Sequence, residues 1–208
     1  MLWIIPIGIV ISYLIGSIPT AYIFGRVLKG IDIRKFGSGN VGATNALRVL
    51  GKPVGISVLV LDILKGFVVV FFLGNTIVAR ITGISDITAR VLLGFCCICG
   101  HNWTIFLRFK GGKGMATTLG ILLGLAVKSV GIKVVFALVI LTWLAVFILT
   151  RIVSLASILS GITLPAYMFL FKQPRILIYS SVLFAIFIIL RHRSNLKRIF
   201  QGKEPRFK

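Results

Sequence analysis

The chain has 208 residues, of which 58% are hydrophobic and only 13% are charged, and its mean hydropathy is +1.06. These values exclude a soluble single domain of this length and predict an integral membrane protein. The net charge of +20 would suggest nucleic-acid binding in a soluble chain. Here the Lys and Arg residues fall between apolar runs, in the loops of a membrane protein, so we expect no nucleic acid as a partner.

Seven apolar runs predict an all-α bundle of seven transmembrane helices that forms one domain, residues 1–208. A helix needs about 20 residues to cross a hydrocarbon core of roughly 30 Å. The first run lacks a preceding basic segment and a small-residue cleavage site, so we expect it to be retained rather than removed as a signal peptide. The fourth run is short and extends into Lys128. The runs cover residues 3–28, 54–74, 89–107, 116–131, 134–150, 153–171 and 176–190.

The basic residues set the orientation that we expect for this bundle. In a seven-span topology, seventeen of the 24 Lys and Arg residues lie on one side and six on the other, while Lys65 lies inside a span. Cytoplasmic loops of membrane proteins carry an excess of Lys and Arg. The N-terminus is therefore expected outside and the C-terminus in the cytoplasm, where the glycine-rich and His-containing loops would meet cytoplasmic metabolites.

The first two runs contain residues that are unusual inside a membrane. Gly16, Ser17 and Pro19 should kink the first helix and free backbone groups near its cytoplasmic half. Asp62 and Lys65 lie in the middle of the second run, three residues apart. Because ionisable residues inside a membrane are costly and usually paired, we interpret these two as a structural ion pair. A transport or catalytic role is the alternative.

The loop after the first run is polar and rich in glycine. Its residues 37–42 spell G-x-G-x-x-G, but no strand precedes them, which excludes a dinucleotide-binding turn. Glycines still permit backbone angles that turn consecutive amides toward one anion. We therefore expect a phosphate site here, the alternative being a flexible loop that only touches anionic lipid headgroups. Glycines, neutral donors and one planar cation make up the set: Gly37, Ser38, Gly39, Asn40, Gly42, Thr44, Asn45 and Arg48.

The third run ends in Gly100-His-Asn-Trp103. His101 is either a buried structural residue or the base that accepts a proton in catalysis. Upstream of it, Cys96, Cys97 and Cys99 contain a C-x-x-C spacing, but the second half of a zinc site is missing. We expect no metal.

A second glycine-rich loop, Lys110-Gly-Gly-Lys-Gly114, follows the third run. It lacks the Lys-Ser/Thr ending and the spacing of a nucleotide-binding Walker A loop, and no Walker-type Asp follows, so a magnesium nucleotide is not expected. The next apolar run begins at once and has Thr117 in its first turn, so the loop amides and a helix N-terminus could face one anion. The alternative is a basic loop that only sets topology.

Polar residues return near the last two runs. Arg151 and Ser154 open the sixth run, and the tail after the seventh run carries His192, Asn195 and Glu204. An exposed basic tail that only controls topology is the alternative interpretation of that last group.

The chain has only four carboxylates, which narrows its chemistry. A pair of catalytic carboxylates is excluded on the cytoplasmic side, and two-metal phosphoryl transfer is not expected. The H-x4-D pattern of many glycerolipid acyltransferases is absent, because Phe106 and Lys197 stand where the Asp would be. What remains is chemistry driven by positive charge, such as attack by a phosphorylated alcohol on an acyl phosphate, whose phosphate leaves readily. The base could be His101, His192 or a phosphate oxygen.

Five motifs in this order resemble the acyl-phosphate-dependent glycerol-3-phosphate acyltransferases of bacteria, the PlsY family. They are Gly16-Ser-Ile-Pro-Thr20, residues 37–45 with Arg48, Gly100-His-Asn-Trp103, residues 109–114, and the tail His192, Asn195 and Glu204. The resemblance implies a seven-helix enzyme of the bacterial plasma membrane with its active site on the cytoplasmic side. Such an enzyme transfers a fatty acyl group from acyl phosphate to the sn-1 hydroxyl of glycerol 3-phosphate, and a soluble enzyme that makes acyl phosphate is its functional partner.

The resemblance, together with the residues themselves, gives the expected site. The residues expected to take part in catalysis are Ser38, Arg48, His101, His192 and Asn195. Those expected to bind substrate are Gly37, Gly39, Asn40, Gly42, Asn45, Lys110, Gly111, Gly112, Lys113, Gly114, Thr117, Arg151 and Ser154. A structural role is expected for Asp62, Lys65 and Glu204. No cofactor is expected.

Two other classes of protein compete with this interpretation. A transporter of organic phosphates would need ionisable residues along a path through the bundle, whereas here Asp62 and Lys65 form the one intramembrane pair. A non-catalytic lipid-binding scaffold would not need glycine-rich anion loops. Acyl phosphate, glycerol 3-phosphate and membrane lipid are therefore the expected partners.

Overall fold

The computed structural model describes residues 3–80 and 82–207, and within them every regular element is a helix. Contacts divide the chain into two compact units, the first ending at Leu125 and the second beginning at Ala126. The single domain expected from the sequence therefore stays a prediction.

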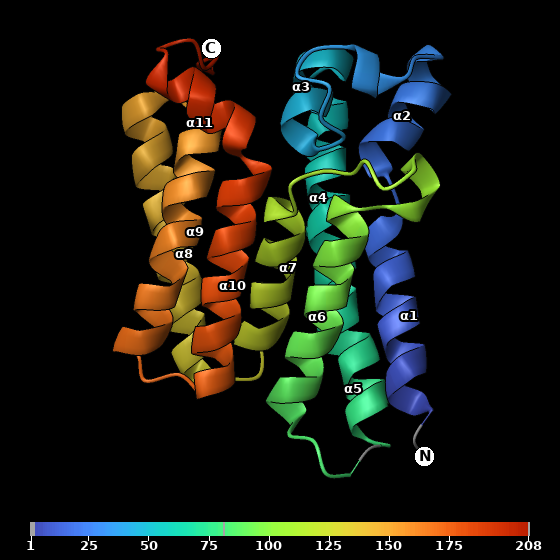
Figure 1. Cartoon of the computed structure of the whole chain (residues 1–208), viewed down its shortest axis with the longest axis vertical. Coiled ribbons are helices and arrows are strands. Elements are labelled where there is room, and N and C mark those ends of the chain that lie inside the picture. Colours follow the sequence, from blue (N-terminus) through green and yellow to red (C-terminus); the bar gives the residue numbers. More distant parts are fainter. Residues whose placement is uncertain (1–2, 81, 208) are drawn as a thin grey trace. The chain divides into compact units, whose positions relative to one another are not determined.

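In the first unit, long helices run between one end that carries the glycine-rich loops and an opposite end where α1 begins (Figure 1). Helix α1 packs along α6, and small residues allow the approach: a Cβ atom on Gly16 would clash with the Cys97 carbonyl, and one on Gly100 with the Tyr13 carbonyl. The elements are α1 (Ile4–Ser17), α2 (Thr20–Lys29), η1 (Ile33–Lys35), α3 (Ala43–Leu50), α4 (Lys52–Val68), η2 (Val69–Leu73), α5 (Gly74–Val78), α6 (Asp86–Asn102), η3 (Ile105–Leu107) and α7 (Met115–Ala126).

The break between α1 and α2 confirms the kink expected in the first span. It falls at Ile18 and Pro19, because proline cannot donate to the helix ladder. The carbonyls that the break frees find side-chain donors from other segments of the chain. Thr104 Oγ1 donates to the Ser17 oxygen (2.6 Å), and Lys65 Nζ donates to the Ile18 oxygen (3.4 Å). The kink is therefore part of a polar contact region between α1, α4 and α6.

A π-helical turn, η2, joins α4 to α5 and accommodates a buried arginine. Arg90 of α6 donates from Nη1 to the Val70 oxygen (2.6 Å), from Nη2 to Asn75 Oδ1 (2.7 Å), and from Nε to Asp86 Oδ1 (2.6 Å). A Cβ atom on Gly74 would meet the guanidinium, so the small residue leaves room for it. Since π-helical turns leave carbonyls available to donors outside the helix, the turn and the arginine stabilise each other.

In the second unit, α9 packs against both α8 and α10, and α11 returns to α9. The turn between α8 and α9 passes through Arg151 in the left-handed region (φ 58°). The chain bends by 62° between α10 and α11. The elements are α8 (Val130–Thr150), α9 (Val153–Leu170), α10 (Arg175–Arg191) and α11 (Arg193–Phe200).

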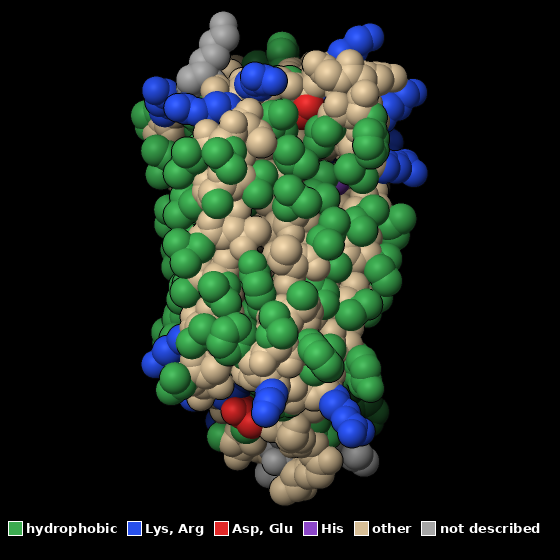
Figure 2. All heavy atoms as spheres, turned by 90° about the vertical axis from the view of Figure 1, so that its left-hand side faces the viewer, with side chains coloured by type: hydrophobic (Ala, Val, Ile, Leu, Met, Phe, Trp, Pro, Cys, Tyr) green, Lys and Arg blue, Asp and Glu red, His purple; other side chains and the backbone are tan. Residues whose placement is uncertain are grey.

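Within residues 3–80 and 82–207, five helical segments are long and apolar enough to cross a membrane, or six if the bent pair of α10 and α11 is one span. The seven spans expected from the sequence are therefore not confirmed. The expected fourth span corresponds to α7, whose 12 residues extend only about 18 Å against a hydrocarbon core of roughly 30 Å. On the face shown in Figure 2, hydrophobic side chains cover the middle and Lys and Arg side chains gather at the two ends. The protein is an all-α, multi-pass membrane protein.

Candidate functional site

The loop between η1 and α3 is shaped by the side chain of Asn45, which is 1% exposed. Its Nδ2 donates to the carbonyls of Asn40 (2.9 Å) and Phe36 (3.1 Å), and its Oδ1 accepts from the Ser38 amide (2.9 Å). Gly37 is left-handed (φ 59°), and a Cβ atom there would clash with Asn45 Oδ1. Asn45, expected to bind substrate, thus holds the loop in shape through both ends of its amide.

The same loop leaves polar groups at its surface. The side chains of Ser38 and Arg48 are exposed, and Asn40 is half-buried. Helix α3 begins after Gly42, and within the part of the chain that the structure describes no side chain caps its N-terminus. Because the first amides of a helix lack partners inside the helix, this end of α3 is suited to an anion.

The second loop is attached to the C-terminal end of α6. The Gly111 amide donates to the Asn102 oxygen (3.1 Å), and the Gly112 amide donates to the His101 oxygen (3.0 Å). These two amides were expected to face a phosphate, and in this conformation they satisfy the last carbonyls of α6 instead. Lys110, which is exposed, and Lys113, which is half-buried, remain the cations that the loop can offer to an anion.

Two buried polar side chains border this second loop. Asn102 is 1% exposed and Thr117 is 0% exposed, and neither amide atom of Asn102 nor Thr117 Oγ1 has a hydrogen-bond partner among the described residues. A Cβ atom on Gly114 would lie 3.0 Å from Asn102 Oδ1. Buried polar groups in proteins are normally hydrogen-bonded, so these two sites are suited to an ordered water or a loop rearrangement.

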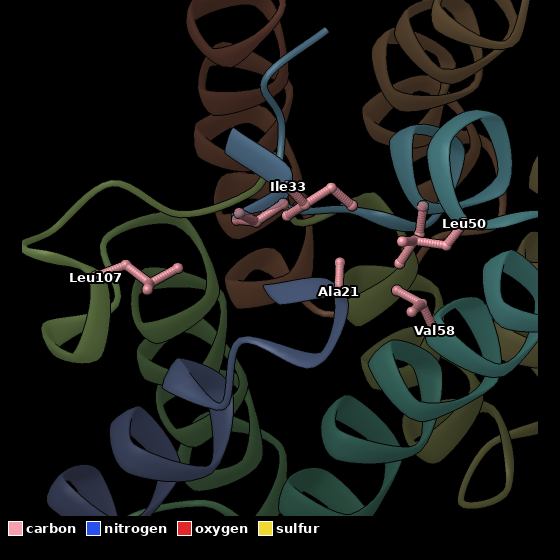
Figure 3. Packing of buried hydrophobic residues seen from close by; sticks show 7 residues of the cluster. Ala21, Ile33, Leu50, Val58 and Leu107 are labelled. Atoms are coloured by element: carbon pink, nitrogen blue, oxygen red, sulfur yellow. The ribbon is translucent and has the colours of Figure 1, made fainter. Parts of the chain in front are cut away.

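The two loops lie at the same end of the first unit. A core cluster joins Ile33, Val41 and Leu50 around the first loop to Leu107, just before the second (Figure 3). Val41 also lines a small pocket together with His101 and further residues: Ser17, Ile18, Pro19, Thr20, Asp62 and Thr104. The predicted site requires Ser38, Arg48 and residues 110–114 to lie at one end of the protein. The structure places them at the same end of the first unit.

Beneath this end lies the buried ion pair expected at Asp62 and Lys65. Lys65 Nζ lies 2.8 Å from Asp62 Oδ1, and both side chains are at most 5% exposed. The spacing of residues in the sequence did not reveal two further partners of this pair. Thr20 Oγ1 donates to Asp62 Oδ1 (2.8 Å), and His101 Nδ1 lies 2.7 Å from Lys65 Nζ. His101 was expected as a candidate site residue, but its contact with Lys65 was not.

Each of the four side-chain carboxylates forms an ion pair with a cation other than Arg48 or Lys110. Asp32 pairs with Arg34 (2.7 Å), and the hydrogen bond from that guanidinium lowers the pKa of Asp32 to about 2. The other pairs are Asp62 with Lys65, Asp86 with Arg90, and Glu204 with Arg198. Among the described residues, Arg48 and Lys110 therefore have no side-chain carboxylate within ion-pair distance, which leaves their charge available to a phosphate.

In the second unit, Glu204 connects the tail to α9 and α11. Its Oε1 accepts from Ser154 Oγ (2.7 Å) and from Asn195 Nδ2 (2.6 Å), and its Oε2 accepts from Arg198 Nε (2.7 Å). The Phe207 amide donates to the Arg151 oxygen (2.7 Å). Ser154 and Asn195, expected at the substrate, thus share contacts with the glutamate expected to be structural.

These contacts control the ionisation of Glu204. Burial acts to raise its pKa, but the hydrogen bonds from Ser154, Arg198 and Asn195 outweigh it and hold the pKa below the ordinary 4.5. A group with a lowered pKa stabilises the fold above its unfolded pKa, and this contribution is lost as the pH falls through the folded value.

We therefore expect Glu204→Gln to lower the melting temperature by about 5 °C at pH 7, since a hydrogen-bonded charge is removed. The difference from the unmodified protein should shrink as the pH falls from 4.5 toward the folded pKa, because the glutamate then becomes neutral too. Thermal unfolding in detergent across this pH range measures both effects. A difference that stays constant with pH would contradict the assignment.

The remaining tail residue, His192, is 3% exposed at the junction of α10 and α11. Its Nδ1 lies 2.9 Å from the Ile188 oxygen. Since a carbonyl can only accept, Nδ1 carries the proton and Nε2 of the neutral ring is the basic nitrogen.

The chain is similar to glycerol-3-phosphate acyltransferases over nearly its whole length. The family model described as "Glycerol-3-phosphate acyltransferase" matches residues 6–202. A glycerol-3-phosphate acyltransferase of Staphylococcus saprophyticus is 42% identical over 205 residues, 98% of each chain. Two crystal structures of PlsY (YgiH), an integral membrane glycerol 3-phosphate acyltransferase, match 98% of this chain. The glycerol 3-phosphate form has 35% identity, 96% coverage of its own chain and a TM-score of 0.86. The lysophosphatidic acid form has 34% identity, 95% coverage of its own chain and a TM-score of 0.83.

Proposed function

This chain is an acyltransferase that belongs to the glycerol-3-phosphate acyltransferase family, and we propose that its acyl donor is an acyl phosphate and its acceptor the sn-1 hydroxyl of glycerol 3-phosphate. The products are lysophosphatidic acid and inorganic phosphate. One observation carries the proposal. The chain resembles, over 98% of its length, an enzyme whose crystal structures are a glycerol 3-phosphate form and a lysophosphatidic acid form.

The first unit supplies the positive charge that such a reaction needs. The attacking hydroxyl oxygen forms a bond to the acyl carbon, the bond from that carbon to the phosphate oxygen breaks, and the phosphate leaves with the electron pair. Two phosphorylated substrates carry roughly −1.5 to −2 charges each, by analogy with phosphomonoesters. Arg48 and Lys110, which have no carboxylate partner among the described residues, together with Lys113, would neutralise this charge. The hydroxyl proton goes to His101, to His192 or to a phosphate oxygen.

The proposal includes the place of the reaction in the cell. Seven spans with the N-terminus outside put the glycine-rich loops and the tail in the cytoplasm of a bacterium, beside its inner membrane. The excess of Lys and Arg on that side supports this orientation. A soluble enzyme that produces acyl phosphate would then supply the donor.

The direct test uses the purified chain in detergent or lipid with acyl phosphate and glycerol 3-phosphate. We expect release of inorganic phosphate together with a lysophosphatidic acid acylated at sn-1, and no turnover when acyl-CoA or an acylated carrier protein replaces the acyl phosphate. Turnover with acyl-CoA alone, or acylation at the other hydroxyl, would overturn the proposed donor or position. Either result would leave the family assignment intact.

Lys113→Ala tests the loop between η3 and α7. We expect the KM for glycerol 3-phosphate to rise about 10- to 100-fold, because a charged hydrogen bond to the phosphate is lost. The melting temperature should change little, since the side chain is only half-buried. Lys35→Ala, which removes an exposed lysine of η1, is the matched control and should leave the KM unchanged. An unaltered KM in Lys113→Ala would remove this lysine from the substrate site.

A further inference from the structure

The buried group around Lys65 uses all of the ammonium's hydrogen-bonding capacity. An ammonium has three N–H donors and no acceptor. Lys65 Nζ lies 2.8 Å from Asp62 Oδ1, 2.7 Å from His101 Nδ1 and 3.4 Å from the Ile18 oxygen. The exposed fractions of the residues are 6% for Lys65, 1% for Asp62 and 7% for His101. Little water can therefore reach this group, and each N–H donor of Lys65 has one acceptor.

This arrangement determines the protonation of the imidazole. Because the ammonium cannot accept, His101 Nδ1 must accept, and the proton of the neutral ring is on Nε2. An imidazolium would place two cations 2.7 Å apart in a buried site, which is strongly unfavourable. Asp62 Oδ1 lies 3.9 Å from Nδ1, too far for the hydrogen bond that would stabilise a proton there.

The other edge of the ring lies against the second glycine-rich loop. A Cβ atom on Gly112 would clash with His101 Nε2, and the Gly112 amide donates to the His101 oxygen (3.0 Å). Both the side chain and the backbone of His101 therefore contact the same loop residue. The small pocket beside the ring is lined by Val41 of the first loop as well. The ring therefore lies at the end of the first unit that carries both loops.

We infer that His101 is a positioning residue, held by Asp62 and Lys65 as the neutral tautomer with its proton on Nε2, and that it supports the loop 110–114 instead of acting as the general base. Its Nε2–H can only donate, and its Nδ1 lone pair is occupied by Lys65. Thr20 Oγ1, which donates to Asp62 Oδ1 (2.8 Å), holds the carboxylate from α2. The Cys97 thiol of α6 is a further titratable group nearby and donates to the Lys65 oxygen (3.9 Å).

The two histidines of the chain then have opposite tautomers. His192 carries its proton on Nδ1, toward the Ile188 oxygen, so its Nε2 is the basic nitrogen. Of the three candidates for the base, His101 is removed, and His192 and a phosphate oxygen remain. This part of the inference rests on the proposed function, whereas the tautomer does not.

Nuclear magnetic resonance of the full chain labelled with 15N-histidine tests the tautomer without an activity measurement. The chain has two histidines, so two sets of ring signals arise, and His101→Gln assigns them. We expect the His101 Nε2 to carry a bound proton and Nδ1 to carry none at neutral pH. A proton on Nδ1 would overturn the inference even if the enzyme is active.

Kinetics separate positioning from proton transfer. The glutamine amide of His101→Gln places an N–H donor near the position of Nε2 but cannot act as a base. We expect this variant to lose less than about 10-fold in kcat/KM, with an unchanged pH profile, while His101→Leu loses about 100-fold, mostly through the KM for glycerol 3-phosphate. Equal, large losses of kcat in both variants would show that His101 is the base. The tautomer measurement applies even if His101→Leu does not fold.

Discussion

Replacing Arg48 by Ala should reduce kcat/KM by about 100- to 1000-fold, the range found when a preorganised donor to a developing charge is removed. Arg48 lies in the last turn of α3, its side chain is exposed, and none of the four side-chain carboxylates pairs with it. A cation without a protein counterion beside a glycine-rich loop is suited to a phosphate, and a guanidinium can bind one through two hydrogen bonds.

Two further variants show whether the guanidinium or only its charge matters. Arg48→Lys keeps the charge but loses the planar pair of donors, so we expect an intermediate loss of about 10-fold. Arg175→Ala removes an exposed arginine at the start of α10 and serves as the control for a general change in net charge. Steady-state kinetics with both substrates varied, together with a melting temperature, complete the measurement. If Arg48→Ala and Arg175→Ala have the same small effect, Arg48 lies outside the reaction site.

The features that the sequence predicted best depend on residues that are close to one another along the chain. Pro19 predicted the break between α1 and α2, because a proline interrupts the helix ladder wherever the helix lies. Asp62 and Lys65 are three residues apart, so helix geometry alone brings them onto one face. The all-helical membrane fold followed from the length and polarity of the apolar runs.

Features that depend on contacts between distant segments could not be predicted in this way. His101 of α6 contacts Lys65 of α4, and helical periodicity does not indicate which faces of two helices pack together. The glycines of the second loop suggested amides directed at an anion, but the Gly111 and Gly112 amides bind the free carbonyls at the end of α6. Every helix end needs such partners, so the proximity of residues 110–114 to that end was the signal that could have revealed it.

The number of membrane spans also could not be predicted from the apolar runs alone. Hydropathy continues past the end of α7 at Ala126, and a sequence window therefore counts a longer segment than the 12 residues that form the helix. Seven of the ten residues from Thr117 to Ala126 are buried, among them Thr117, Ile121 and Leu125, so apolar side chains here pack against protein. An apolar run indicates burial, and only its helical length distinguishes burial in lipid from burial in protein.

Removing the charge of Asp62 should cause the largest loss of stability among these variants. In Asp62→Asn the buried Lys65 ammonium keeps His101 Nδ1 and the Ile18 oxygen as acceptors but loses its counterion. Breaking a buried ion pair by removing one partner costs about 3–5 kcal/mol, because the other charge stays buried without compensation. Unfolding of the purified chain in mixed micelles, followed against denaturant, measures this difference.

Asp86→Asn is the matched control, because it makes the same chemical change in another aspartate that pairs with a buried cation. Asp86 is 50% exposed in its side chain, and its partner Arg90 also donates to the Val70 oxygen and to Asn75, so we expect a loss below about 1 kcal/mol. The double variant Asp62→Asn with Lys65→Met removes both charges and should recover most of the stability that Asp62→Asn loses. Recovery of stability need not restore activity, since the double variant also frees His101 Nδ1. If Asp62→Asn is no less stable than Asp86→Asn, the ion pair beneath the glycine-rich loops does not hold this end of the fold together.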